Sequence, residues 1–195
     1  MQDKSENIYI NSRLSILTTN ILLKRFLKHI NEEKFFLQDK SVLLALSGGI
    51  DSMCLFHLML ESKIHFSVAH FDHNTRHGES LKDAEFVKSI CSKYQVKFHL
   101  SSMDDNFKIN NFQAEARRQR YEFFNSLDFD MIATAHHYDD DTETILMNFL
   151  QGKSLNGINA KSSNIVRPLL IFKKLEIEKY VKMKARTEHQ PRSHQ

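Results

Sequence analysis

Short apolar runs alternate with amphipathic stretches along most of the chain. The run over 42–46 is apolar at every position, stops at Gly48 and Gly49, and is followed by helical spacing over 52–60. A short run that is apolar on both faces is typical of a strand buried in a parallel sheet. The same pattern recurs and predicts strands over 64–70, 96–100 and 130–135, and helices over 80–94, 112–127 and from Asp140 onward.

This alternation indicates a doubly wound α/β fold with a mostly parallel, five-stranded sheet and helices on both faces. The fifth strand is expected over 165–170, and apolar residues at helical spacing predict a leading helix over 14–30. Capping boxes are expected from Ser80 with Asp83 and from Asp140 with Glu143. We therefore expect an N-terminal extension over 1–40, one nucleotide-binding domain over 41–182 and an unstructured tail over 183–195.

The net charge and the cysteine content limit the classes of protein to which this chain can belong. The 195 residues carry a formal charge of +3, which permits a nucleic-acid partner without requiring one. Cys54 and Cys91 lie far apart and form no CxxC pair, so neither a disulfide framework nor a zinc knuckle is indicated. We expect neither a signal peptide nor a membrane span, because the apolar patches are short and interrupted by basic residues. A cytoplasmic protein is the prediction.

The segment 47–52, with the sequence SGGIDS, is the most specific local signal. It lies between the first apolar strand and its helix and holds two of the five glycines. Glycine lets backbone amides approach a phosphate, and a helix N-terminus offers unpaired donors. No GxxxxGKS/T motif is present, which favours pyrophosphate binding over transfer of a γ-phosphoryl group. The alternative is an ordinary glycine turn with Asp51 or Ser52 as the helix cap.

Two histidine-containing segments follow later strands. His70 ends the second predicted strand and His73 follows it, and the segment 134–144, with the sequence TAHHYDDDTET, lies where the fourth predicted strand meets its helix. Ligands in open parallel sheets gather beyond the carboxyl ends of the strands, so these segments and 47–52 are expected to face one cleft. His136 suits contact with an α-phosphate, and a neighbouring carboxylate suits magnesium or proton transfer. A metal cluster of His70, Asp72, His73 and His77 is the alternative at the first segment.

The helix expected over 112–127 has a basic side. Phe112, Ala116, Phe123 and Leu127 share its apolar face, whereas Arg117, Arg118 and Tyr121 lie away from that face. An arginine off the core face can reach a phosphate. The alternative is a solvated basic surface.

Five segments together resemble one family, the tRNA(Ile)-lysidine synthetases, which are PP-loop (N-type) ATP pyrophosphatases. The segments are SGGxDS at 47–52, HxxHxxR at 70–76, ARxxRY at 116–121, AHHxDDxxET at 135–144 and RPLL at 167–170. The resemblance spans about 41–182. It implies that ATP is bound by Ser47, Gly48, Gly49, Ile50, Asp51 and Ser52, with the loop amides and the serines on its pyrophosphate part. It further implies catalytic roles for Asp51, Arg117, His136 and Asp140, and magnesium ligands in Asp51 and Asp139.

What the resemblance implies for function is ATP-dependent ligation of free L-lysine to carbon 2 of the wobble cytidine of tRNA(Ile). ATP and Mg²⁺ would be required, the tRNA adenylate would be an intermediate, and AMP and pyrophosphate would be released. Members of this family continue beyond the matched region, so a truncated, non-catalytic nucleotide-binding fragment is one alternative. Another PP-loop enzyme, such as an amidotransferase-linked synthetase or a tRNA sulfurtransferase, is a second alternative, although the cysteine pairs of the thiolating relatives are missing. A homodimer is left open.

Overall fold

A computed structural model describes residues 20–35, 39–74, 79–103 and 112–188. Its centre is one six-stranded sheet with the order β3-β2-β1-β4-β6-β5. All pairings are parallel except that of β5 with β6. The strands are β1 (Val42–Ala45), β2 (Phe66–Asp72), β3 (Phe98–Ser102), β4 (Met131–Ala133), β5 (Lys161–Ser162) and β6 (Ile165–Val166). The predicted doubly wound parallel fold is confirmed, with one additional two-residue strand at the edge.

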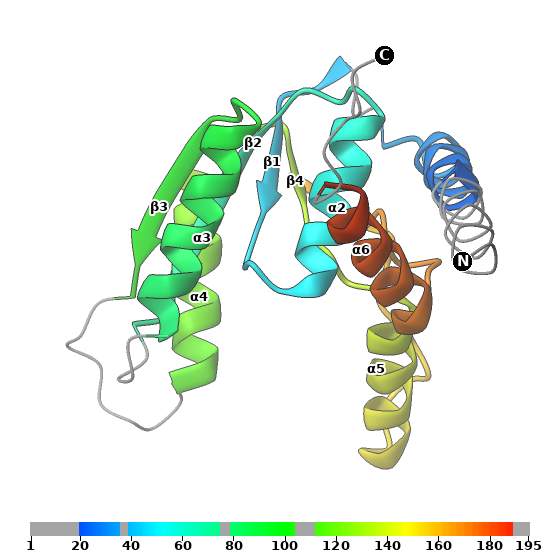
Figure 1. The fold of residues 1–195 in the computed structure, drawn as a ribbon. Helices are drawn as coiled ribbons and strands as arrows, with labels where there is room; N and C mark the ends of the chain where they lie inside the picture. Colours follow the sequence, from blue (N-terminus) through cyan, green and yellow to red (C-terminus); the bar gives the residue numbers. More distant parts are fainter. Residues whose placement is uncertain (1–19, 36–38, 75–78, 104–111, 189–195) are drawn as a thin grey trace, which may run out of the picture.

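The helices follow the predicted order (Figure 1). They are a helix over 20–32, α2 (Ile50–Glu61), α3 (Glu79–Lys93), α4 (Phe112–Ser126), α5 (Tyr138–Leu150) and α6 (Lys174–Glu188). Part of the predicted leading helix, 14–19, lies outside the described residues. Helix α6 continues beyond residue 182, where the unstructured tail was expected to begin, and only 189–195 of that tail lie outside the described chain.

The start of α5 differs from the prediction. The helix begins at Tyr138 with His137 in the N-cap position, so Asp140 is not the cap but the third residue of the helix. Its Oδ2 accepts a hydrogen bond from the backbone N–H of His137 at 2.8 Å. Asp140 is therefore the carboxylate that reaches back to the cap rather than the cap itself. The side chain of Ser80, the other predicted cap, lies outside the described part.

Strand β1 is apolar throughout because it is the centre of the sheet and is covered on both faces. Val42 and Leu44 belong to one core cluster and Leu43 to the other, as the twofold alternation of a strand requires. The first cluster joins the sheet to the helix over 20–32, α2, α3 and α6. The second joins it to α4 through Ala116 and Phe124.

The strand order reverses direction at β1. Strands β2 and β3 extend from one side of β1, whereas β4 and β6 extend from the other. The carboxyl ends of β1 and β4 are neighbours because these two strands pair in parallel. The turn before α2 and the segment before α5 therefore lie side by side, which is where an open α/β sheet binds its ligand.

Candidate functional site

A cavity of about 470 Å³ lies at the carboxyl ends of β1, β2 and β4. Its volume falls within the range of small-molecule and cofactor sites, roughly 300–1,000 Å³. Four of the five segments singled out in the sequence contribute to its polar lining, namely 47–52, 70–76, 116–121 and 135–144. The polar and charged lining residues are Ser47, Asp51, Ser52, His70, Asp72, His73, Asp83, Arg120, Tyr121, Thr134, His136 and Asp140.

In the turn before α2, no side chain of the N-cap residue accepts a hydrogen bond from the first backbone N–H groups of the helix. Gly48 has φ +91°, a conformation that residues with a side chain rarely adopt. Gly49 is the N-cap of α2 and has no side chain to bond the first-turn N–H groups; among the described residues none caps them. Unpaired amides at the positive end of a helix form a natural anion site.

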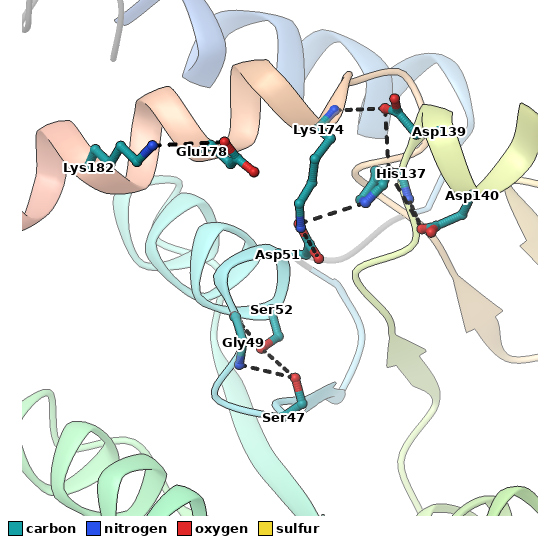
Figure 2. Close-up of polar contacts among 10 residues, drawn as sticks. All are labelled: Ser47, Gly49, Asp51, Ser52, His137, Asp139, Asp140, Lys174, Glu178 and Lys182. Atoms are coloured by element: carbon teal, nitrogen blue, oxygen red, sulfur yellow. Dashed lines mark hydrogen bonds and ion pairs between the residues drawn. The ribbon is translucent and has the colours of Figure 1, made fainter. Parts of the chain in front are cut away.

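Two hydroxyls brace this turn (Figure 2). The Ser52 hydroxyl donates to the Gly49 carbonyl at 2.9 Å, and the Gly49 N–H donates to Ser47 Oγ at 3.3 Å. Because the one hydroxyl proton of Ser52 is used in this way, the 3.1 Å contact between the two hydroxyls has Ser47 as its donor. Ser47, Asp51 and Ser52 line the cavity, whereas Gly48, Gly49 and Ile50 shape the turn without being part of the lining.

Asp51 lies in the first turn of α2 and has an unexpected partner. The ammonium group of Lys174, at the start of α6, donates to its two carboxylate oxygens at 2.6 and 2.8 Å (Figure 2). His137 Nε2 lies 3.7 Å from Asp51 Oδ1. The predicted magnesium ligand is thus paired with a lysine that is 123 residues away in the sequence.

His136 enters the cavity from the segment between β4 and α5. Its Nδ1 lies 3.0 Å from the hydroxyl of Thr134. When that hydroxyl donates to Nδ1, the ring proton is on Nε2, and the imidazole can donate a hydrogen bond to an anion. Burial lowers the pKa of His136, and the positive charge of Arg167 lowers it further. The imidazole is therefore neutral near pH 7.

The arginines of α4 are arranged differently from the prediction. Arg117 is exposed, stacks on the ring of Tyr121 at 5.0 Å and does not line the cavity. Arg120 lines it instead, because it shares a four-residue stripe with Ala116 and Phe124, the two residues that α4 buries. Of the predicted apolar face, Ala116 is buried and Phe123 and Leu127 are partly buried against the same cluster, whereas Phe112 is exposed and Phe124 is buried in addition.

The histidine segment after β2 also reaches the cavity. His70 Nδ1 donates to the Leu46 carbonyl at 2.8 Å, which ties β2 to the end of β1. Asp72 and His73 line the cavity as well. Within the described ranges no group of three or more His, Cys, Asp or Glu side chains is placed to hold a metal ion. Arg76 and His77, which the sequence also suggested, lie outside those ranges.

Asp139 and Asp140, in the first turn of α5, make different contacts. Asp140 faces the cavity, whereas Asp139 accepts the backbone N–H of Lys174 at 2.7 Å and so caps α6. Asp139 is not part of the cavity lining, whose carboxylates are Asp51, Asp72, Asp83 and Asp140. This set fits Mg²⁺, which is commonly held by one or two carboxylates together with substrate phosphates and water.

Sequence reasoning missed Lys174 and Arg120 as site residues. Arg120 had a usable signal, namely its spacing of four residues from both Ala116 and Phe124. The pairing of Lys174 with Asp51 had none, because the two residues lie on different helices and no local pattern links them. Arg167, the first residue of the RPLL segment, is not part of the cavity lining. It is buried and donates to the Asn159 carbonyl at 2.6 Å.

Four histidines link the stability of the protein to pH. Burial lowers the pKa of His29, His73, His99 and His136 below the ordinary value of 6.5. Between the lowered folded value and 6.5 the unfolded chain binds more protons, so the free energy of unfolding falls as the pH falls. We expect urea denaturation to give a smaller unfolding free energy at pH 5.5 than at pH 7.5. His29→Asn should flatten this difference, and an unchanged difference in that variant would contradict the assignment.

Comparison with known proteins relates this chain to one family model. The model, described as a PP-loop domain, matches residues 18–188. A tRNA(Ile)-lysidine synthase of Bacteroides thetaiotaomicron is 33% identical over 172 residues, which is 83% of this chain and 40% of that protein. One from Chlorobaculum tepidum is 36% identical over 177 residues, 83% of this chain and 53% of that protein. The chain thus spans about half or less of the length of these curated relatives.

Solved structures share the fold. A U34-tRNA thiolase of Methanococcus maripaludis, solved with its [4Fe-4S] cluster, has a TM-score of 0.66 and 16% identity over 94% of this chain and 68% of the thiolase. An NH3-dependent NAD synthetase of Campylobacter jejuni has a TM-score of 0.53 and 15% identity over 86% of this chain and 72% of the synthetase. At these identities the similarity concerns the architecture alone. In the described ranges no helix is both long and apolar enough to cross a bilayer.

Proposed function

Because this chain belongs to the PP-loop domain family, we propose that its cavity binds Mg-ATP and supports the reaction for which the curated relatives are named. That reaction joins L-lysine to carbon 2 of the wobble cytidine of tRNA(Ile). The observation that carries the proposal is one cavity that joins the uncapped start of α2 and Asp51 to His136 and Arg120. Adenylation requires hydrogen-bond donors to the phosphates, a carboxylate and a neutral imidazole close together in one site.

Each group has a role in the proposed chemistry. The first-turn amides of α2 hold the pyrophosphate part of ATP, and Arg120 and neutral His136 donate to the α-phosphate as negative charge develops on it. The carbonyl oxygen on carbon 2 of the cytosine attacks the α-phosphorus, and the bond to the β-phosphate breaks to release pyrophosphate. The amine of lysine then attacks carbon 2, and AMP leaves. Magnesium, when bound, supplies charge compensation for the phosphates next to Asp51.

One carboxylate must take a proton from the lysine ammonium before it can attack. Asp140 is the candidate because it lines the cavity and lies on the same segment as His136. Asp139 is engaged by the backbone of Lys174 and lies outside the lining, so it is less suited to either metal or substrate. The fit to free lysine, rather than to another acceptor, rests on the relatives alone.

The proposed reaction is tested with the 195-residue chain, an isoleucine tRNA transcript, Mg-ATP and radiolabelled lysine. Label should enter the tRNA, and a transcript with uridine at the wobble position should remain unlabelled. Pyrophosphate release stimulated by a sulfur donor rather than lysine would favour a tRNA sulfurtransferase. Nucleotide binding without any transfer would reduce the chain to a nucleotide-binding fragment.

Asp51→Asn is expected to weaken Mg-ATP binding at least about tenfold, because it removes the charge of an oxygen ligand while keeping the shape of the side chain. Calorimetric titration of the folded variant with Mg-ATP measures the effect. The matched control is Glu85→Gln, which neutralises an exposed carboxylate on α3 that does not line the cavity. Equal affinities for the wild type and Asp51→Asn would remove Asp51 from the magnesium site.

A further inference from the structure

The contact between Lys174 and Asp51 joins the first turn of α6 to the first turn of α2 (Figure 2). The lysine ammonium is within 2.8 Å of both carboxylate oxygens. This bidentate contact uses one lone pair on each oxygen and places a positive charge beside both of them. The negative charge that would attract Mg²⁺ to the turn is therefore already compensated by the protein itself.

Lys174 is held in this place at both ends. Asp139 accepts its backbone N–H at 2.7 Å, so the residue that begins α6 is anchored to the start of α5. The side chain extends from there to Asp51 and is 38% exposed. A fixed backbone with a partly solvated, flexible four-carbon stem allows the ammonium group to change partners while the helix remains in position.

Mg²⁺ and this ammonium group compete for the same oxygens. Mg²⁺ binds a carboxylate oxygen directly at about 2.0–2.1 Å in a nearly octahedral arrangement. An ammonium that contacts both oxygens occupies the space in which the ion and its waters would lie. Direct binding of Mg²⁺ to Asp51 thus requires Lys174 to leave.

Charge indicates where the ammonium group of Lys174 binds after it leaves Asp51. The segment 47–52 has no lysine, so the pyrophosphate position lacks the cation that a GxxxxGKS/T loop would carry. A lysine ammonium is a good point-charge ligand for phosphate. Lys174 is close enough to the start of α2 to contact Asp51, and phosphates bound to the first-turn amides lie at the same helix end.

We propose that Lys174 is an exchangeable counter-ion: it pairs with Asp51 when no nucleotide is bound and moves to the pyrophosphate when Mg-ATP enters. This inference rests on the proposed nucleotide site. It assigns Lys174 two opposite effects, since it excludes a bare divalent cation but contributes to binding of the metal–nucleotide. As a consequence, Lys174 makes the site selective for the metal–nucleotide complex over the metal ion or the nucleotide alone.

Lys174→Met separates the two effects. Without nucleotide, removal of the ammonium should tighten binding of Mn²⁺, a paramagnetic substitute with the same oxygen preference as Mg²⁺, by about threefold or more, because the competing ion pair is partly exposed. Water-proton relaxation measures this affinity. In calorimetry with Mg²⁺ and inorganic pyrophosphate, the same variant should bind about threefold or more weakly than the wild type.

The matched control is Lys182→Met, which removes a lysine two turns further along α6. Lys182 is exposed and pairs with Glu178 at 3.9 Å, far from the carboxylates of the site (Figure 2). It should change neither affinity. Lys174→Gln, which keeps a polar head without the charge, should reproduce both effects of Lys174→Met and covers the case in which methionine disturbs the start of α6.

Opposite shifts in the two Lys174 variants, absent in Lys182→Met, support the exchange. Unchanged Mn²⁺ affinity overturns the counter-ion role, and unchanged pyrophosphate affinity overturns the move to phosphate. Failure of the proposed function has a different signature, because the wild-type protein would then bind neither Mg-pyrophosphate nor Mg-ATP. The Mn²⁺ measurement without nucleotide would still report on Asp51 and Lys174.

Discussion

His136→Ala is expected to slow pyrophosphate release by about a hundredfold or more, a loss on the order of 3 kcal/mol in transition-state stabilisation. The reason is that the half-buried imidazole lines the cavity, is kept neutral by burial and by Arg167, and has Nδ1 engaged by Thr134. In the proposed reaction, a neutral donor next to the α-phosphate would act where negative charge develops. Single-turnover release of pyrophosphate in the presence of isoleucine tRNA transcript measures the rate.

The control for this prediction is His65→Ala. His65 is an exposed residue in the loop before β2 and does not line the cavity. Its replacement should leave the rate within twofold of the wild type, roughly 0.4 kcal/mol. A wild-type rate for His136→Ala in a folded protein that binds Mg-ATP normally would refute the role of His136.

Phe56→Ala is expected to lower the free energy of unfolding by about 3–5 kcal/mol. Phe56 is completely buried on α2, with ring centroids 5.6 Å from those of Phe66 and Tyr94 in edge-to-face arrangements. Its removal leaves a cavity between α2, β2 and α3 that the surrounding side chains cannot fill. Urea denaturation at pH 7.5 measures the change. For a domain of this size the loss threatens folding itself.

Phe149→Ala is the matched control, because it deletes the same side chain from another helix. Phe149 lies on α5, which extends away from the sheet (Figure 1), and is 64% exposed. We expect a change within about 0.5 kcal/mol. If Phe149→Ala lowered the free energy of unfolding as much as Phe56→Ala, burial of the side chain would not explain the loss of stability.

The order of strands and helices was readable from the sequence because each depends on a local pattern. The apolar run over 42–46 could be buried only between two layers, and β1 is the central strand. Gly48, before α2, likewise required a turn that residues with side chains rarely make, because its φ is +91°. That the segments after β1 and β4 share a cavity followed from the chirality and order of parallel strands, which leave few alternatives.

Shorter elements and helix ends were less predictable. Strands β5 and β6 have two residues each, too few for any periodicity, and are held by pairing with β4 and with one another. The start of α5 was misplaced because His137, Asp139 and Asp140 all suit a helix start, and the choice among them depends on the direction from which β4 enters.

The sequence by itself determined the fold class and the turn at 47–52, because these depend on neighbours in the chain, and the rule that ligands gather at the carboxyl ends of parallel strands predicted that His136 lies near that turn. Only the tertiary structure decided that Arg120 rather than Arg117 lines the cavity, since the rotation of α4 is set by the burial of Ala116 and Phe124. It alone brought Lys174 to Asp51 and assigned Asp139 to the start of α6. Such pairings are chosen by the packing of whole helices, which residue spacing within any one segment does not encode.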